Sequence, residues 1–274
     1  MRRDRLSPLA LAFVLLGAAL MIAPLVWTLL LSLKDNGELM RDSGAAFGGP
    51  YTLENYRAIL RGDMVFRWLL NSLIVSLGTT AGVLALSSLA GFAFARLDFP
   101  FRRTLFVFVL LGLAIPEQAV ILPQHRLFAD LGLHNSYPGL ILPGLVGSFG
   151  VFFMTQYFRG LPRDLDEAAA LDGASTLQIF WRVLLPLTVP AQATLGVFTF
   201  LGSWNAYWWP LISATTADRF TLTIGLASAQ ANYAQTNGLG YLMAQAVFAS
   251  LPILMVYVVF QKQIVRAMAG TAVR

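Results

Sequence analysis

Long apolar stretches without a single charged residue alternate with short polar segments along this 274-residue chain. Each stretch is longer than the ~18 residues that mark a membrane-span candidate. The pattern therefore predicts an all-α integral membrane protein. The five charge-free stretches are Leu6 to Leu33, Trp68 to Ala95, Asn135 to Phe158, Val183 to Ala217, and Phe220 to Gln261.

We expect six transmembrane helices, the third of them interrupted by Pro116 and Glu117. The first apolar stretch is too long for the core of a cleaved signal peptide, so we take it as an uncleaved span. The expected spans are 9–33, 68–94, 104–122, 138–158, 187–212 and 242–260. The expected layout is a cytoplasmic N-terminal tail at 1–8, a first transmembrane helix at 9–33, an extracytoplasmic loop at 34–66, a five-helix membrane domain at 67–262 with a cytoplasmic loop at 159–186, and a cytoplasmic tail at 263–274.

The composition supports a membrane protein, since 57% of the residues are hydrophobic and only 12% are charged. Soluble domains carry about 25% charged residues. If both termini are cytoplasmic, the cytoplasmic segments hold 12 of the 19 basic residues but only 6 of the 14 acids. The positive-inside rule then accounts for the net charge of +5, without a nucleic-acid partner. There is no cysteine, which excludes disulfides and thiolate metal sites.

The cytoplasmic segment from Leu161 to Pro186 has an explicit local pattern. Its first half begins after Pro162 and places three acids in the first helical turns, where the helix dipole favours negative charge. Gly173 then predicts a helix end, because glycine adopts positive φ without a steric penalty. The three acids are Asp164, Asp166 and Glu167.

The second half of this segment predicts another short helix. Ser175 and Gln178 have the spacing of a capping box. Apolar side chains follow at helical spacing and predict one apolar stripe. Such a stripe needs a cover: the membrane surface, the ends of the chain's own helices, or a groove in a partner protein. The stripe consists of Leu177, Phe180, Trp181 and Leu184.

The segment also matches a known family signature, which reads E-A-A, three residues, G, nine residues, and I-x-L-P. Here the signature appears as Glu167-Ala168-Ala169, Gly173 and Val183-x-Leu185-Pro186, with valine in place of isoleucine. Through most of its length the chain resembles the inner-membrane permease subunits of binding-protein-dependent ABC importers, and is most similar to carbohydrate permeases of the maltose-transporter type. The resemblance implies a type I ABC importer permease fold in the bacterial inner membrane.

The resemblance also implies partners and roles. The loop would be a coupling helix that seats in a cytoplasmic ATP-binding subunit dimer, with Glu167 paired to a basic group there. The other partners implied are a second permease, which the maltose-type resemblance suggests is a different chain, an extracytoplasmic solute-binding protein, and membrane lipid. The ATPase-coupling residues implied are Glu167, Ala168, Ala169, Asp172, Gly173, Phe180 and Pro186.

The energy source is expected on another polypeptide. The only two lysines, Lys34 and Lys262, follow no glycine-rich loop, so the chain has no Walker A motif. We therefore expect no enzyme activity and no cofactor on this chain, with ATP used by the partner subunit. His125 and His134 are assigned no role.

Aromatic and polar residues near the end of the fifth span are candidates for the substrate path. Flat rings suit sugars, but Trp and Tyr also form interfacial belts, so both interpretations stay open. Glu117 could shape an outer gate or be a solvated acid at the interface. The hydroxyls of the second span could line a polar path or serve helix packing. The candidates near the fifth span are Trp204, Asn205 and Tyr207.

Two other functional classes compete with an importer subunit. An ion-coupled secondary transporter of a small polar solute would carry ionisable residues near mid-membrane and often inverted repeats. An integral-membrane enzyme would need histidine or acid clusters at the membrane face. Neither set of features is evident in the sequence. The expected cargo is a sugar or sugar-like solute, with a polyol or glycerol phosphate also open.

Overall fold

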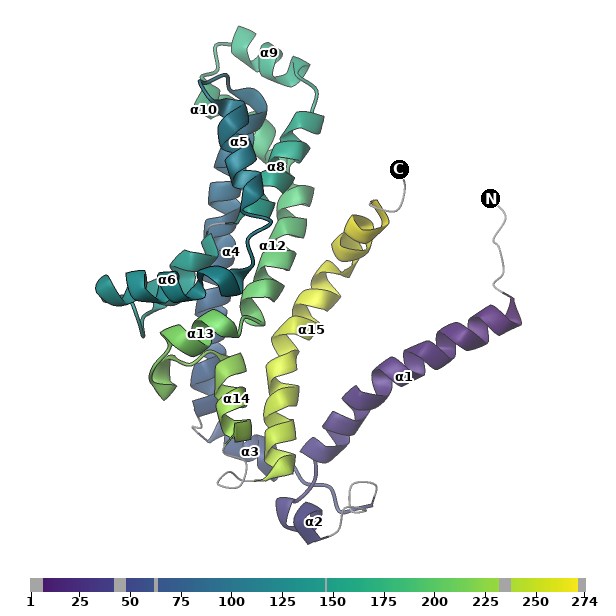
Figure 1. The fold of residues 1–274 in the computed structure, drawn as a ribbon. Coiled ribbons are helices and arrows are strands. Elements are labelled where there is room, and N and C mark those ends of the chain that lie inside the picture. The colour runs from purple at the N-terminus through teal and green to yellow at the C-terminus, as the bar shows by residue number, and fades with distance from the viewer. Residues whose placement is uncertain (1–6, 42–47, 62–63, 146, 232–237, 271–274) are drawn as a thin grey trace. The chain divides into compact units, whose positions relative to one another are not determined.

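The computed structural model describes residues 7–41, 48–61, 64–145, 147–231 and 238–270, and these residues are helical without a β-strand (Figure 1). Most of the tail at 1–8, and the end of the tail at 263–274, lie outside the described residues. The helices are α1 Pro8–Ser32, α2 Asn36–Arg41, α3 Glu54–Leu60, α4 Met64–Arg96, α5 Arg102–Leu111, α6 Glu117–Asp130, α7 Tyr137–Ile141, η2 Leu142–Leu145, α8 Ser148–Gly160, α9 Asp164–Leu171, α10 Thr176–Gln178, η3 Ile179–Leu184, α11 Leu185–Leu187, α12 Val189–Trp204, α13 Trp208–Ser213, η4 Ala217–Arg219, α14 Leu222–Ala231 and α15 Leu239–Gly270.

Three of the described helices are long and apolar enough to cross a membrane by themselves: α1, α4 and α15. Two bent helix pairs meet the same criterion together. The pair 137–145 and 148–160 is bent by 47°, and the pair 176–187 and 189–204 by 75°. The described helices thus provide three spans, or five when each bent pair counts as one.

The third predicted span, 104–122, is interrupted before Glu117, as the sequence predicts. Helix α5 ends at Leu111, and α6 begins only at Glu117. Pro116 between them has ψ 138°, an extended conformation, and proline has no N–H to continue a helical ladder. The ten residues of α5 span about 15 Å at 1.5 Å per residue, half of a ~30 Å hydrocarbon core. Figure 1 shows α6 lying crosswise to α4 and α12.

The predicted fifth span, 187–212, is also interrupted. Helix α12 ends at Trp204, and α13 starts again at Trp208. The side chain of Asn205 donates to the carbonyl of Leu201 at 2.8 Å, and so serves a carbonyl at the end of α12. The aromatic run of the sequence is therefore divided between two helices.

The chain divides into two compact units. The first unit comprises residues 1–67 and 225–251, and buried amides hold it together. The Nδ2 atom of Asn55 in α3 donates to the carbonyls of Ser32 and Lys34, each at 2.9 Å. Asn36 donates to Asn55 Oδ1 at 3.0 Å and accepts from the backbone N–H of Gly240 at 2.7 Å. These bonds join the end of α1, α3 and the start of α15.

The second unit comprises residues 68–224 and 252–274, and it contains every candidate site residue. Small residues of α4 allow its neighbours to approach closely. A Cβ added at Gly78 would lie 2.9 Å from Ile141, and one added at Gly91 would lie 2.7 Å from Cβ of Met154. Small residues of α4 therefore serve packing against α7 and α8, which is one of the two interpretations for this span.

Candidate functional site

The first half of the 161–186 segment forms the helix that its sequence predicts. Helix α9 carries Asp164, Asp166 and Glu167 in its first turn. It ends at Leu171, and the chain turns at Gly173, where φ is +81°. The N–H of Ala174 donates to the carbonyl of Ala169 at 3.0 Å, which is the hydrogen bond of a Schellman motif. The glycine elbow is confirmed.

The second half begins with the predicted capping box. The N–H of Gln178 donates to Ser175 Oγ at 3.4 Å, and the N–H of Ser175 donates to Gln178 Oε1 at 2.8 Å. The chain then follows a π-helix, η3, from Ile179 to Leu184. Phe180 and Leu184 are buried, whereas Leu177 and Trp181 are exposed. The chain's own helices thus cover one part of the predicted apolar stripe, and the other part is left exposed.

Phe180 anchors this half of the segment in the core of the second unit. Its ring centroid lies 5.0 Å from that of Phe92 in α4 and 6.3 Å from that of Phe158 in α8. The Phe92 and Phe158 rings meet edge to face at 6.0 Å. Aromatic pairs at these separations stabilise packing beyond the burial of their area. The segment is thus attached to two long helices through one buried ring.

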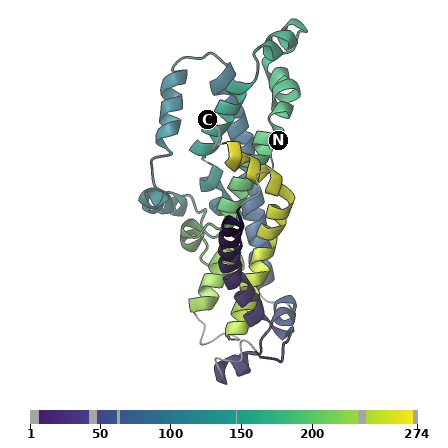
Figure 2. The same cartoon turned by 90° about the vertical axis from the view of Figure 1, so that its right-hand side faces the viewer.

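An ion pair attaches the first half as well. Nε of Arg96, at the end of α4, lies 3.1 Å from Oδ2 of Asp166, and the side chain of Arg96 is only 6% exposed. Nη2 of Arg96 also donates to the carbonyl of Leu161 at 2.8 Å. Figures 1 and 2 show the segment at one end of the second unit, where α4 ends. Both halves are therefore held to α4.

Part of the segment's surface is exposed and apolar, although other side chains such as Leu165 and Ile179 belong to the core cluster or pack against it. Leu171 is 89% exposed, and Leu177 and Trp181 add further exposed apolar surface. Ala169 is half-buried and packs against the core cluster. The other sequence-predicted coupling residues are exposed, and these are Glu167, Ala168, Asp172, Gly173 and Pro186.

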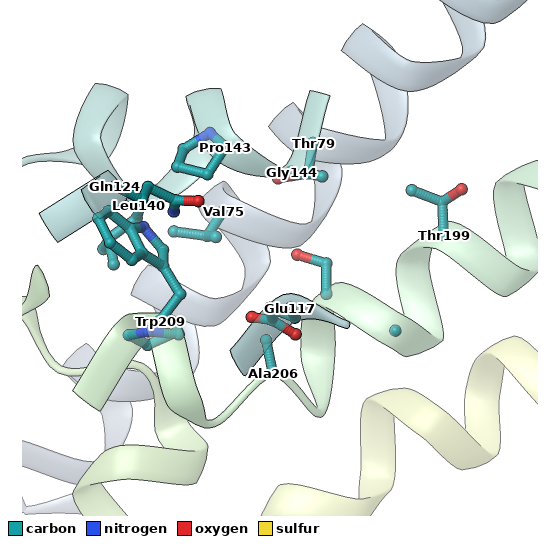
Figure 3. A pocket seen from close by; sticks show the side chains of 13 residues that line it. Val75, Thr79, Glu117, Gln124, Leu140, Pro143, Gly144, Thr199, Ala206 and Trp209 are labelled. Carbon is teal, nitrogen blue, oxygen red and sulfur yellow. The ribbon is translucent and has the colours of Figure 1, made fainter. Parts of the chain in front are cut away.

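A second feature of this unit is a cavity of about 260 Å³ (Figure 3). Its lining comes from helices that are far apart in the sequence: α4, α6, α7, η2, α12 and α13. Figure 3 shows Glu117, Gln124 and Trp209 around this space. The lining residues are Val75, Thr79, Glu117, Gln124, Leu140, Pro143, Gly144, Thr199, Gly202, Ser203, Ala206, Trp209 and Pro210.

Trp209 is held firmly in the cavity wall. Its Nε1 donates to the carbonyl of Gly139 at 2.9 Å. Phe128 meets its ring edge to face at 5.1 Å, and the ring of His134 lies 5.9 Å away. His134 in turn packs against His125, with ring centroids 4.5 Å apart. His134 Nε2 lies 3.0 Å from the carbonyl oxygen of His125, so the two histidines are joined to each other behind Trp209.

The structure separates the sequence-predicted substrate-path residues. Glu117 lines the cavity, at the first residue of α6. Trp204 is buried and stacks on Phe200 at 5.6 Å, Asn205 is exposed, and Tyr207 packs edge to face on Trp208. These last three candidates do not line the cavity.

Sequence reasoning missed several polar residues of this cavity. Gln124, Thr199 and Ser203 carry no local signal, because each looks like an ordinary polar residue in a helix. Trp209 lay within the aromatic run but was not chosen as a substrate-path residue. Thr79 was among the hydroxyls of the second span, for which a polar path was one of two interpretations.

A family model described as the binding-protein-dependent transport system inner membrane component matches residues 84–270. The chain therefore belongs to this family and is a multi-pass inner-membrane permease subunit of an ABC importer. This confirms the resemblance seen in the 161–186 segment and rejects the ion-coupled alternative. A component of this kind works with a second permease, an ATPase and a binding protein, and is not itself the catalytic subunit.

Several curated proteins are similar over nearly the whole chain. The arabinooligosaccharides transport system permease protein AraQ of Bacillus subtilis (strain 168) is 37% identical, over 96% of this chain and 94% of that protein. The diacetylchitobiose uptake system permease protein NgcG of Streptomyces coelicolor is 33% identical, over 95% of this chain and 86% of that protein. The trehalose transport system permease protein SugB of Mycobacterium tuberculosis is 31% identical, over 95% and 94%.

A solved structure has the same fold. It is a crystal structure of a bacterial ABC transporter involved in the import of the acidic polysaccharide alginate, and one of its chains matches with a TM-score of 0.78. The match covers 96% of this chain and 98% of that chain, at 20% identity. The expected fold class, an all-α integral membrane protein with the type I importer permease fold, is confirmed.

Proposed function

We propose that this permease forms, with a second permease, the translocation path for a sugar or sugar-like solute delivered by an extracytoplasmic binding protein. Transport is coupled to a cytoplasmic ATPase dimer through the 161–186 segment. ATP-driven closure of the dimer moves this segment, and the segment moves the helices to which it is attached. The mechanism is a rigid-body switch between two states that the nucleotide biases.

The observation that carries this proposal is the division of the 161–186 segment into an anchored and an exposed side. Phe180 and Asp166 attach it to the membrane helices, while Glu167, Leu171 and Trp181 remain exposed. A short element with exposed apolar side chains and an exposed acid fits the groove of a partner protein. Firm attachment is what a mechanical connection requires, since a loose loop would absorb the movement.

The distribution of arginines supports a cytoplasmic position for the segment. Arg102, Arg103, Arg159 and Arg163 line one pocket close to the segment. Clusters of basic residues mark the cytoplasmic ends of membrane helices. With six crossings, as the sequence predicts, a cytoplasmic segment would place both termini of the chain in the cytoplasm as well.

The nature of the solute is proposed from the relatives. The named cargoes of the first relatives are arabinooligosaccharides, diacetylchitobiose and trehalose, all saccharides. A further group of relatives, at 29–30% identity, is named for sn-glycerol-3-phosphate. The similarity is higher for the saccharide permeases, which favours a saccharide here.

The partner permease is proposed to be a different chain, and the ATP is proposed to bind only to the ATPase subunits. Purified alone, this chain is expected to bind no nucleotide, because it has no glycine-rich phosphate loop. Titration of the purified permease with a fluorescent ATP analogue tests this. Saturable binding would contradict the assignment of ATP to the partner.

The coupling proposal is tested by reversing the charge of Glu167 in the complete transporter. Glu167→Lys is expected to leave membrane insertion intact, because the side chain is exposed. It should release the ATPase during purification and abolish ATP-dependent uptake, since it places a cation against the basic group proposed to receive Glu167. Co-purification of the ATPase and uptake into proteoliposomes are the two measurements.

The matched control is Asp130→Lys, the same class of change at an exposed acid that ends α6. This variant should retain the ATPase. Normal uptake by Glu167→Lys, or equal loss in both variants, would contradict coupling through the 161–186 segment.

A further inference from the structure

We propose that the cavity lined by Thr79, Glu117 and Trp209 binds one ring of a neutral saccharide, and that Glu117 makes this site reject anionic solutes. The inference rests on the proposed function of sugar import and deepens it. It places a saccharide contact site inside this permease. It also predicts that the translocation path favours neutral over anionic solutes. The physical basis is a set of polar groups that the fold leaves without a partner.

Five polar side chains line the cavity, and none of them forms a hydrogen bond with another described residue. Thr79 is only 5% exposed, and its hydroxyl, which has no hydrogen-bond partner among the described residues, is accessible from the cavity. A ligand rich in hydroxyls could bond to this group directly from the cavity. The five residues are Thr79, Glu117, Gln124, Thr199 and Ser203.

These groups supply the complementary chemistry for sugar hydroxyls. Glu117 offers acceptors only, Gln124 offers a donor and an acceptor group, and hydroxyls offer both. Sugar hydroxyls also act as both donors and acceptors, so one ring could bond to several of these residues. The Trp209 ring, fixed by the Gly139 carbonyl, adds a flat apolar wall beside them.

The size of the cavity sets the length of the solute portion that it holds. Its volume of about 260 Å³ lies just below the ~300–1,000 Å³ usual for small-molecule sites. Two lining residues, Gly144 and Gly202, have no side chain that would take up space in the cavity. A Cβ at Gly144 would lie 2.8 Å from Cγ2 of Thr79, whereas one at Gly202 would meet no atom within 4 Å. The space therefore suits a single ring of a longer chain.

The charge of the cavity comes from Glu117 alone among the described lining residues, since no Lys, Arg or His lines it. A phosphate or carboxylate brought close to this acid would be repelled. Allowing for screening at an exposed carboxylate, the repulsion corresponds to about tenfold in binding. Neutral saccharides escape this penalty, and anionic solutes do not.

The natural absence of cysteine gives a direct experiment. Ser203→Cys places a single thiol in the cavity wall with little change of volume, and Thr215→Cys places one at an exposed position outside it. Both variants are studied in the complete transporter. Trehalose and diacetylchitobiose serve as neutral probes, and glycerol 3-phosphate as the anionic probe. The rate of modification by methanethiosulfonate reagents is measured with and without each probe.

A transported neutral saccharide is expected to slow modification of the Ser203→Cys variant severalfold and to leave that of the Thr215→Cys variant unchanged, while glycerol 3-phosphate protects neither. The charge preference has its own readout. Without saccharide, a trimethylammonium reagent should modify the Ser203→Cys variant faster than a sulfonate reagent does. Adding Glu117→Gln should remove this difference and improve protection by glycerol 3-phosphate about tenfold. A role of Glu117 in folding alone would not change the reagent preference.

The outcomes separate the two proposals. If the transporter takes up a neutral saccharide with ATP but that saccharide leaves the thiol of the Ser203→Cys variant unprotected, the cavity proposal is wrong and the transport proposal stands. If Glu117→Gln leaves the reagent preference unchanged, the charge assignment is wrong. If the complete transporter takes up glycerol 3-phosphate and no saccharide, both proposals are wrong.

Discussion

Arg96 and Asp166 join the longest helix of the second unit to the segment proposed to receive the ATPase: Nε of Arg96 lies 3.1 Å from Oδ2 of Asp166. The same helix, α4, carries Thr79 in the cavity wall. Thr79 and Arg96 are separated by about 25 Å along this helix, at 1.5 Å per residue. One continuous helix therefore connects the proposed saccharide site with the proposed coupling site.

Removing the charge of Asp166 should weaken this connection. Asp166→Asn leaves the Arg96 guanidinium, 6% exposed, without its counter-charge, and should destabilise the protein by about 2 kcal/mol. Uptake should fall even where the ATPase stays bound. The midpoint of thermal unfolding of the purified complex and the uptake per ATP hydrolysed check this. Asp164→Asn, at an exposed acid of the same turn, is the control and should change neither quantity.

The elbow at Gly173 should tolerate only residues that accept positive φ. Gly173→Ala is expected to cost about 1–2 kcal/mol, because φ +81° is a strained conformation for an L residue. Gly173→Asn should cost less, since asparagine adopts left-handed conformations more readily. Uptake should follow the same order, wild type, then asparagine, then alanine. A normal rate for alanine with a reduced rate for asparagine would reject the role assigned to the elbow.

Filling the cavity should stop transport without unfolding the protein. At Gly202 a leucine side chain extends into open space, and leucine is the better helix former. We expect Gly202→Leu to keep the wild-type unfolding midpoint and ATPase association but to lose most saccharide uptake. Gly17→Leu in α1 also meets no atom within 4 Å at its Cβ, and serves as the control with uptake retained.

The buried amide of Asn55 should stabilise the first unit more than the exposed ion pairs of its neighbour Glu54 do. Asn55→Ala removes three hydrogen bonds, including those to the carbonyls of Ser32 and Lys34, and should cost about 3 kcal/mol. Its neighbour Glu54 forms exposed ion pairs with Arg57 and Arg61. Glu54→Ala should therefore cost less than about 1 kcal/mol. Thermal unfolding of the two variants gives the comparison, and equal midpoints would contradict it.

Local signals in the sequence correctly predicted most of the 161–186 segment. The acidic first turn, the positive φ of Gly173 and the Ser175–Gln178 capping box all appear as expected. These features depend on residues within one turn of each other. The predicted apolar stripe is only partly covered, because Phe180 and Leu184 pack in the core cluster with residues of α4 and α8, whereas Leu177 and Trp181 stay exposed.

Long-range features could not be read in the same way. Pro116 indicates an interruption of the third span. The sequence does not indicate that α6 lies crosswise and brings Glu117 next to α4 and α12 (Figure 1). The sequence placed Trp204 and Glu117 together as candidates, yet only Glu117 reaches the cavity. Which side of a helix faces a cavity depends on how its neighbours pack.

The sequence by itself determined the membrane class, the helix-glycine-helix segment and the family, because apolar length, capping chemistry and a spaced motif are properties of continuous stretches. Only the tertiary structure decided the Arg96–Asp166 ion pair and the polar lining of the cavity. Both join residues from helices distant in the chain. Their positions follow from the close packing of those helices, which glycines such as Gly78 and Gly91 permit, and no local pattern encodes that arrangement.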